Sequence, residues 1–402
     1  MTYAASAAFV AASLWILSRA KAFDAAARAP ALMLAIGAGV SIVYRVVGLP
    51  FLPPDWVAAG ADVLLAALAF VAAAQFRISR LSSVCPASFR LTMGGAPLFL
   101  VVCGLAAFIL LPQLTFASAM LVSGALMLNG AAFDRRAVAD TPAPAVIKAA
   151  VRLESAAILA LGITVVYLLE ATASAAPGGQ PVVAPLLEAS IALFTAFAIG
   201  GGLGLLAASL GNRLKHKEKR VLLAVGSAVV AFCLTGLLGG HPVIAAMAAG
   251  LLWGEQSTAP VTTRVRMRRS AERVIAPAAY LAFGVLLAPR IFQADLLTVV
   301  FAVAAITVMR AGPRLAALKK TTLPKESQMF LAWFGGAPGA ASALFLISLL
   351  DAPAIIAQDA VLTVGALAVT FGVVAARLTS RPLIKSFLKQ TALAKKRALF
   401  AG

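Results

Sequence analysis

The stretch Gln328–Leu350 reads QMFLAWFGGAPGAASALFLISLL and is nearly free of charge. Its length is enough to cross the hydrocarbon core of a bilayer as an α-helix, which needs roughly 20 apolar residues. The Gly335-Gly336-Ala337-Pro338-Gly339 segment interrupts it, because proline removes a backbone donor and glycine favours the helix weakly. Within a membrane the backbone groups released by such a break must be satisfied by protein or by a water-filled cavity. The stretch therefore predicts a broken membrane helix beside a polar site.

The whole chain has the composition of an all-α, polytopic membrane protein. Of its 402 residues 62% are hydrophobic and only 12% are charged, which is more apolar surface than a soluble fold can cover. We identify about 13 apolar segments as candidate transmembrane helices. They span residues 4–18, 30–48, 56–76, 92–112, 115–133, 145–169, 182–211, 220–239, 241–254, 274–290, 293–311, 328–350 and 357–379.

The basic residues predict the orientation of these helices. All but two of the 34 Lys and Arg residues, Arg45 and Arg290, lie in or beside every second gap or in the C-terminal tail. Cytoplasmic loops collect Lys and Arg, so we expect a multi-pass protein of the cell (inner) membrane with its N-terminus outside. The basic tail, 386–402, should lie in the cytoplasm on the membrane surface. Because the charge is divided among short loops, the net +19 indicates contact with lipid headgroups and does not indicate nucleic-acid binding.

An odd number of segments permits two inverted repeats. Repeat one would cover about 1–170, a linking helix 182–211, and repeat two about 220–385, so that 1–385 forms a single transmembrane domain. Inverted repeats, which many secondary transporters contain, predict two interrupted helices in matching positions that bracket a site near the middle of the membrane. Asn129-Gly130 stands in the fifth segment and the glycine-rich break in the twelfth, as this plan requires.

Ionisable residues inside apolar segments are the candidate functional groups, because charge in lipid is costly. Glu154, with Ser155 beside it, lies well inside the sixth segment. A proton-coupled carrier needs a carboxylate that binds either a proton or a cation. The alternative role of Glu154 is an internal salt bridge with Lys148, Arg152 or Arg310.

Two further acids are weaker candidates. Asp62 lies near the outer end of the third segment and could bind an ion or merely line a solvated entry. Asp134 follows the fifth segment and could pair with the arginines after it or admit ions from the cytoplasm. We found no catalytic triad, nucleotide-binding loop or metal-ligand cluster. The sequence therefore predicts a secondary carrier or channel, and not an enzyme, with no cofactor and no metal beyond a transported cation.

Several motifs resemble those of the NhaP-like sodium/proton antiporters of the monovalent cation/proton antiporter superfamily. Glu154-Ser155 matches the Glu-Ser of the family's Gly-Glu-Ser-Leu-Leu-Asn-Asp signature. The other similar stretches are Phe76–Leu81, His241–Gly254, Arg310, Phe330–Ser342 and Thr379–Lys385. The resemblance covers nearly the whole chain. It implies an antiporter fold with crossed broken helices and a homodimer that exchanges Na⁺ or K⁺ for H⁺ by alternating access.

The departures from the family pattern fall on its ion-binding residues. The family's Asn-Asp pair would align with Ile158 and Leu159, and the arginine before Gly339 is Pro338 here. Asn129, Ser155 and carbonyls freed at the breaks could still supply oxygens beside Glu154. The loss of the Asn-Asp pair also permits a transport-inactive relative that serves as a sensor, scaffold or partner subunit. A carrier of a larger or anionic solute, bound by helix N-termini at the breaks, is a third possibility.

Overall fold

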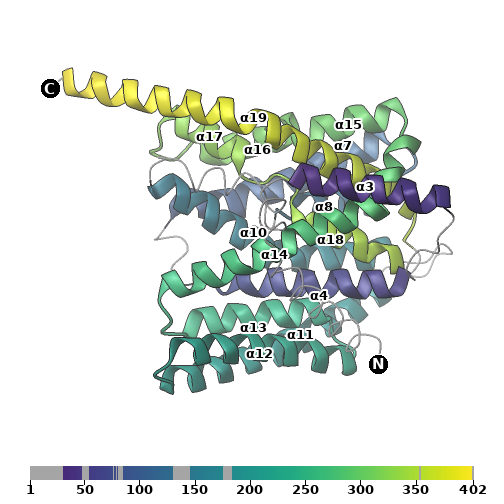
Figure 1. Ribbon diagram of the computed structural model, residues 1–402. Coiled ribbons are helices and arrows are strands. Elements are labelled where there is room, and N and C mark those ends of the chain that lie inside the picture. The colour runs from purple at the N-terminus through teal and green to yellow at the C-terminus, as the bar shows by residue number, and fades with distance from the viewer. Residues whose placement is uncertain are drawn as a thin grey trace.

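The computed structural model describes residues 30–47, 54–75, 77, 79, 85–129, 145–174, 183–352 and 355–400. Within these ranges every element of regular secondary structure is a helix, which confirms the all-α prediction (Figure 1). In the described part of the chain, seven helices are long and apolar enough to cross a membrane, and three shorter apolar helices accompany them. The predicted first segment, 4–18, lies outside the described residues, so the total of 13 stays a prediction.

The described helices of the first half follow the predicted segments closely. They are α3 (Pro30–Val47), α4 (Pro54–Ala73), α6 (Pro86–Arg90), α7 (Ala96–Leu110), α8 (Phe116–Met127) and α10 (Ala145–Ala173). A turn of π-helix, η2 (Leu91–Gly95), joins α6 to α7, so the three make one span, Pro86–Leu110. Then follow α11 (Val183–Arg213), α12 (Lys217–Leu237) and the short α13 (Pro242–Gln256).

The second half departs from the predicted boundaries in three places. The helix expected over 274–290 is α14 (Val261–Leu286), which begins inside the basic stretch and ends before the 3₁₀ turn η3 (Ala288–Gln293). The helix expected to end at residue 311 continues as α15 (Leu296–Ile306) and α16 (Val308–Leu318), with a break at Thr307. The last helix, α19 (Gln358–Phe400), runs on through the basic tail and beyond the bundle (Figure 1).

The predicted break in the twelfth segment is confirmed. The segment folds as α17 (Lys325–Phe334) and α18 (Ala340–Ser348), separated by the extended backbone of Gly335–Gly339 and followed by the 3₁₀ turn η4 (Leu349–Asp351). In the fifth segment α8 ends at Met127, and Leu128 and Asn129 are non-helical. Gly130 and Asp134 lie outside the described residues.

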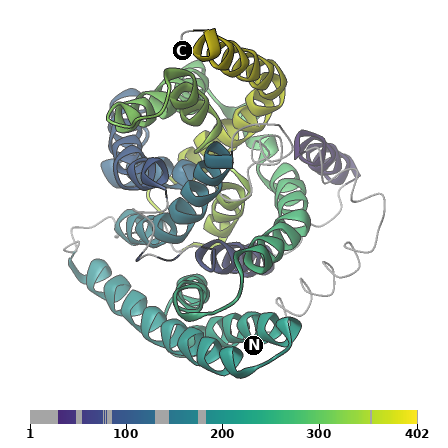
Figure 2. The same ribbon diagram turned by 90° about the vertical axis from the view of Figure 1, so that its left-hand side faces the viewer.

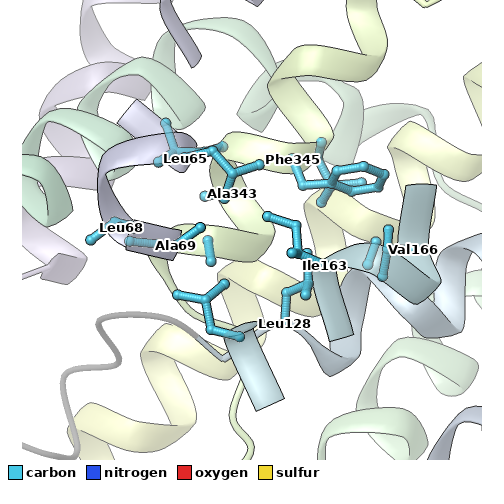
Figure 3. Packing of buried hydrophobic residues seen from close by; sticks show 14 of the residues in the cluster. Leu65, Leu68, Ala69, Leu128, Ile163, Val166, Ala343 and Phe345 are labelled. Atoms are coloured by element: carbon cyan, nitrogen blue, oxygen red, sulfur yellow. The ribbon is translucent and has the colours of Figure 1, made fainter. Parts of the chain in front are cut away.

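Helix α4 lies at the centre of the bundle and packs against α10, α13, α14 and α18. Leu65, Leu68 and Ala69 of α4 are fully buried in a continuous apolar core (Figure 3). The same view shows Leu128, where α8 stops, among the core side chains near Ile163 of α10. The polar backbone at the end of α8 is therefore surrounded by packed apolar groups.

Small residues hold the short helix α13 between α11 and α4 (Figure 2). A Cβ atom at Gly200 or Gly204 of α11 would stand 2.8 Å from the Cα of Ala245 or Ala249, respectively. On its other side α13 places Gly250 against the backbone of Phe70 in α4 and Gly254 against that of Ala74, directly after α4. Such spacing of small residues lets membrane helices approach closely, because packing replaces the hydrophobic effect in lipid.

Candidate functional site

A buried ion pair joins α10 to α16 at the interrupted helix. Glu154 of α10 is fully buried and Arg314 of α16 is 4% exposed. Both oxygens of the carboxylate accept from the guanidinium: Nη1 donates to Oε1, and Nη2 donates to Oε2 at 2.9 Å. A planar guanidinium matches the two oxygens of a carboxylate, so this two-pronged geometry is among the strongest for an ion pair.

The same arginine satisfies carbonyl groups at the end of α17. Its Nε donates to the carbonyl oxygen of Ala332 at 3.0 Å and its Nη2 to that of Leu331 at 2.9 Å. The Leu331 carbonyl also accepts from the backbone N–H of Gly335 at 3.1 Å, whereas carbonyls further into the last turn of a helix have no partner within it, and burying them unpaired is unfavourable. Arg314 therefore neutralises Glu154 and stabilises the end of α17 at the same time.

The glycines of the break make room for this arginine. A Cβ atom at Gly335 would overlap the guanidinium of Arg314, and one at Gly336 would stand 2.6 Å from its Nη1. Gly336 also has φ +77°, in the left-handed region where residues with a side chain are strained. The predicted helix break is thus the cavity into which Arg314 fits.

The two interrupted segments meet at the carbonyl of Leu128. This group, at the end of α8, accepts hydrogen bonds from the backbone N–H of Gly339 at 3.5 Å and from the hydroxyl of Ser342. Helix α18 begins at Ala340, directly after this contact. The end of α8 and the start of α18 therefore meet here, as the prediction of two crossing segments requires, while the continuation of the fifth segment lies outside the described residues.

Ser155 and Asn129 lie beside this crossing. The Ser155 hydroxyl donates to the carbonyl oxygen of Asn129 at 3.5 Å and accepts from Nη2 of Arg268 at 3.2 Å. Arg268 of α14 is 4% exposed and also pairs with Glu272 at 2.6 Å. Its Nη1 donates to the carbonyl oxygen of Arg152 at 3.3 Å. Two arginine side chains thus occupy the polar centre of the bundle.

The ion-pair partner predicted for Glu154 was wrong. We expected Lys148, Arg152 or Arg310, whereas the structure pairs it with Arg314, one helical turn after Arg310. Arg310 donates to the carbonyl oxygen of Trp333 at 2.9 Å, and its guanidinium lies 5.3 Å from the centre of that indole ring. Arg314 was missed because it follows the predicted end of the helix, among charges assigned to a cytoplasmic loop.

Ile158 and Leu159, at the positions of the family's Asn-Asp pair, are 3% and 1% exposed in the apolar core. They contribute packing and no oxygen ligand. The region around the crossing therefore contains the apolar side chains of Ile158 and Leu159 and the carboxylate of Glu154, which is paired with Arg314.

Asp62 lies in a different place, in a polar cavity of about 220 Å³. Along α10, the end that reaches this cavity, Glu170, is about 24 Å from Glu154. The polar groups that line the cavity are Asp55, Asp62, Tyr167, Glu170, His241, Ser348 and Asp351. It is formed where α4, α10, α13 and α18 come together.

Within this cavity the Tyr167 hydroxyl donates to Oδ1 of Asp62 at 3.5 Å. The Tyr167 ring lies against the His241 ring, with centroids 3.6 Å apart and the two planes tilted by 45°. Oε2 of Glu170 is buried and has no hydrogen-bond partner among the described residues. Glu170 and Asp351 were not predicted to belong to a site. The signal that could have identified them is that all these groups lie at the predicted outer ends of their helices.

Among the described residues there is no group of three or more His, Cys, Asp or Glu side chains that could hold a metal ion.

Comparison with known proteins agrees with this architecture. A family model described as sodium/hydrogen exchanger, transmembrane, matches residues 7–385. The sodium proton antiporter MjNhaP1 from Methanocaldococcus jannaschii, in a structure at pH 8, superposes with a TM-score of 0.71 at 14% identity, covering 94% of this chain and 99% of that one. An electron-microscopy structure of the same antiporter gives a TM-score of 0.58 at 17% identity, covering 91% and 96% of the two chains. No curated protein sequence matches the chain.

Proposed function

Because the chain belongs to the sodium/hydrogen exchanger family, we propose that it exchanges Na⁺ or K⁺ for protons across the membrane by alternating access. The observation that carries the proposal is the cavity around Asp62, which brings several carboxylates together among membrane-spanning helices. Negative charge is expensive to place inside a membrane without a positive partner. A group of acids there therefore favours binding of cations and protons over anions.

We assign the exchange of ions to Asp62 in preference to Glu154. Both oxygens of Glu154 accept from Arg314, and the pair is shielded from solvent. A cation could bind Glu154 only after this buried pair separated, which would leave Arg314 charged and unpaired. Asp62 faces a cavity instead, and its described contact is a hydrogen bond from Tyr167.

A cation that sheds water needs several oxygens in return. Asp62, the Tyr167 hydroxyl, Glu170 and Ser348 all line the cavity and could provide them. A proton and a cation compete for the same carboxylate, so occupancy by one excludes the other. We therefore expect cation-driven proton flux to decrease when the pH falls far enough to keep the acids protonated.

The test is cation-driven proton flux in proteoliposomes that contain wild-type protein or the Asp62→Asn variant. We expect the variant to lose at least about tenfold in flux, because asparagine keeps the shape of the side chain and cannot bind a proton reversibly. Glu188→Gln is the matched control, since Glu188 is an exposed acid on α11 outside the cavity. Equal flux in wild type and Asp62→Asn would remove Asp62 from the mechanism.

A second candidate is favoured by Ile158 and Leu159, which replace oxygen ligands with hydrocarbon at the crossing. Under it the protein keeps the fold but acts as a sensor, scaffold or partner subunit. Wild-type vesicles without cation-dependent proton flux, from mildly acidic to mildly alkaline pH, would favour this role.

The resemblance to the antiporters also leads us to propose a homodimer. Its mass in lipid nanodiscs would distinguish two copies from one.

A further inference from the structure

A small basic pocket lies where α11 ends and α12 and α14 begin. It has a volume of about 80 Å³ and is lined by Lys215, Arg220, Val221, Ala259, Pro260 and Thr263. A pocket of this size has room for a small group such as a phosphate. The pocket shares no lining residue with the Asp62 cavity and includes neither Glu154 nor Arg314.

Arg220 is held in place at this pocket before any ligand binds. Its Nε donates to the carbonyl oxygen of Leu214 at 2.8 Å and its Nη1 to the hydroxyl of Thr258 at 3.3 Å. Thr258 is fixed in turn, because its backbone N–H and its hydroxyl both donate to Oδ1 of Asn212 at 2.9 Å. Arginine has five N–H donors, so these two bonds orient the guanidinium and leave others for a ligand.

The electrostatics of the pocket favour an anion. Two of its lining residues are basic and none is acidic. Helix α14 begins at Val261, and the first turn of a 26-residue helix adds the positive end of its dipole beside Pro260 and Thr263. The exposed acid nearest in sequence, Glu218, is in the first turn of α12 and does not line the pocket.

Exposed apolar side chains continue from the pocket along the two helices that flank it. Leu222, Val225 and Val229 follow one face of α12 and are 73%, 40% and 55% exposed. Leu206 and Leu210 are similarly exposed on α11. Both helices are candidate membrane spans, and Figure 2 shows them at the edge of the bundle. A phospholipid has a charged headgroup and apolar acyl chains. The basic pocket suits the headgroup and the adjoining apolar faces of α11 and α12 suit the acyl chains.

We propose that this pocket binds the phosphate of an anionic phospholipid in the cytoplasmic leaflet, with its acyl chains along α11 and α12. Basic pockets between membrane helices on the cytoplasmic side suit such headgroups. The bound phosphate bridges Lys215 and Arg220 to the start of α14, and so connects the α11–α12 turn to the helix that carries Arg268. This proposal is independent of the ion site and does not require transport.

The test is native mass spectrometry of the purified protein, titrated with phosphatidylglycerol and, in parallel, with phosphatidylcholine. We expect wild type to bind phosphatidylglycerol preferentially, and the Lys215→Gln/Arg220→Gln variant to lose about fivefold in affinity for each charge removed. The control Lys319→Gln/Lys320→Gln removes the same charge from another exposed loop and should keep wild-type affinity. Lys215→Gln alone serves if the Arg220 substitution disturbs folding, because Lys215 is an exposed side chain.

An equal loss in the control, or undiminished binding by the Lys215→Gln/Arg220→Gln and Lys215→Gln variants, would overturn the proposal. Inorganic phosphate provides the remaining arm. If phosphate stabilises wild type against heat as strongly as phosphatidylglycerol does, the pocket is a free-anion site and the lipid assignment is wrong.

Discussion

At the scale of single residues, Arg314 joins three parts of the site: α10, α16 and the interrupted helix. It pairs with Glu154 of α10 and donates to two carbonyls of α17, and Gly335 and Gly336 leave room for its guanidinium because they have no side chain. The pair is buried, so its two members depend on each other: removal of one leaves the other charged in a medium of low dielectric constant.

The variant Glu154→Gln should therefore be strongly destabilised. Breaking a buried pair by removing one partner costs about 3–5 kcal/mol in the free energy of unfolding. Thermal unfolding of the purified protein in detergent measures this loss, and Glu188→Gln on the exposed face of α11 is the control. Identical melting temperatures for the two variants would show that the ion pair contributes nothing to stability.

The break itself makes a second prediction. Gly335→Ala should destabilise the protein by about 1–3 kcal/mol, because the added methyl group overlaps the Arg314 guanidinium in a packed site. Gly312→Ala is the matched control, since no atom lies within 4 Å of the methyl group it would add and alanine favours the α16 helix. If denaturation midpoints are the same for Gly335→Ala and Gly312→Ala, the proposed fit of arginine into the glycine break is incorrect.

The sequence predicted one side of this site and missed the other. Glu154 was found because an acid in an apolar segment is conspicuous, and Gly335–Gly339 because glycine and proline weaken a helix. Arg314, Arg264 and Arg268 were counted as loop residues, yet all three are buried. The number of basic residues in a segment depends only on their positions along the chain. Whether an arginine is buried depends on the carbonyls and carboxylates that other parts of the fold place beside it.

At the scale of elements, helix boundaries were predictable where apolar residues alone determine them. The ends of α11 and α18 fall close to their predicted positions. The predicted start of α14 and the predicted end of α16 were wrong, because both helices continue through basic residues. Contacts with other parts of the fold satisfy the charge of those residues. Arg264, near the start of α14, donates to the carbonyls of Gly254 and Ser257 at 2.7 Å each, which makes a helical arginine acceptable there.

The contact between α11 and α13 should depend on the size of Gly204. A leucine side chain there would collide with the backbone of Ala249, so Gly204→Leu should separate the helices and reduce the yield of folded protein. Gly202→Leu on the same helix meets no atom within 4 Å at its Cβ and should be tolerated. Size-exclusion profiles in detergent measure the outcome; matching profiles for the two variants would contradict the close packing.

At the scale of the whole molecule, the distribution of charge predicts the orientation in the membrane. The span Leu296–Leu318 separates two exposed positions, Gln293 and Lys319, so they should face opposite sides. In a variant whose Cys85, Cys103 and Cys233 are replaced by alanine, we expect a membrane-impermeant maleimide to label Gln293→Cys in intact cells. Lys319→Cys should react only after the membrane is permeabilised. The reverse pattern would invert the predicted topology.

The attachment of Arg314 has a mechanical consequence for the bundle. One side chain ties α16 to α10 and to the end of α17, while the adjoining α18 bears against the end of α8 through Leu128. The Asp62 cavity lies at the other end of α10, about 24 Å from Glu154, so the ion exchange proposed at Asp62 would leave this attachment and its buried charges in place.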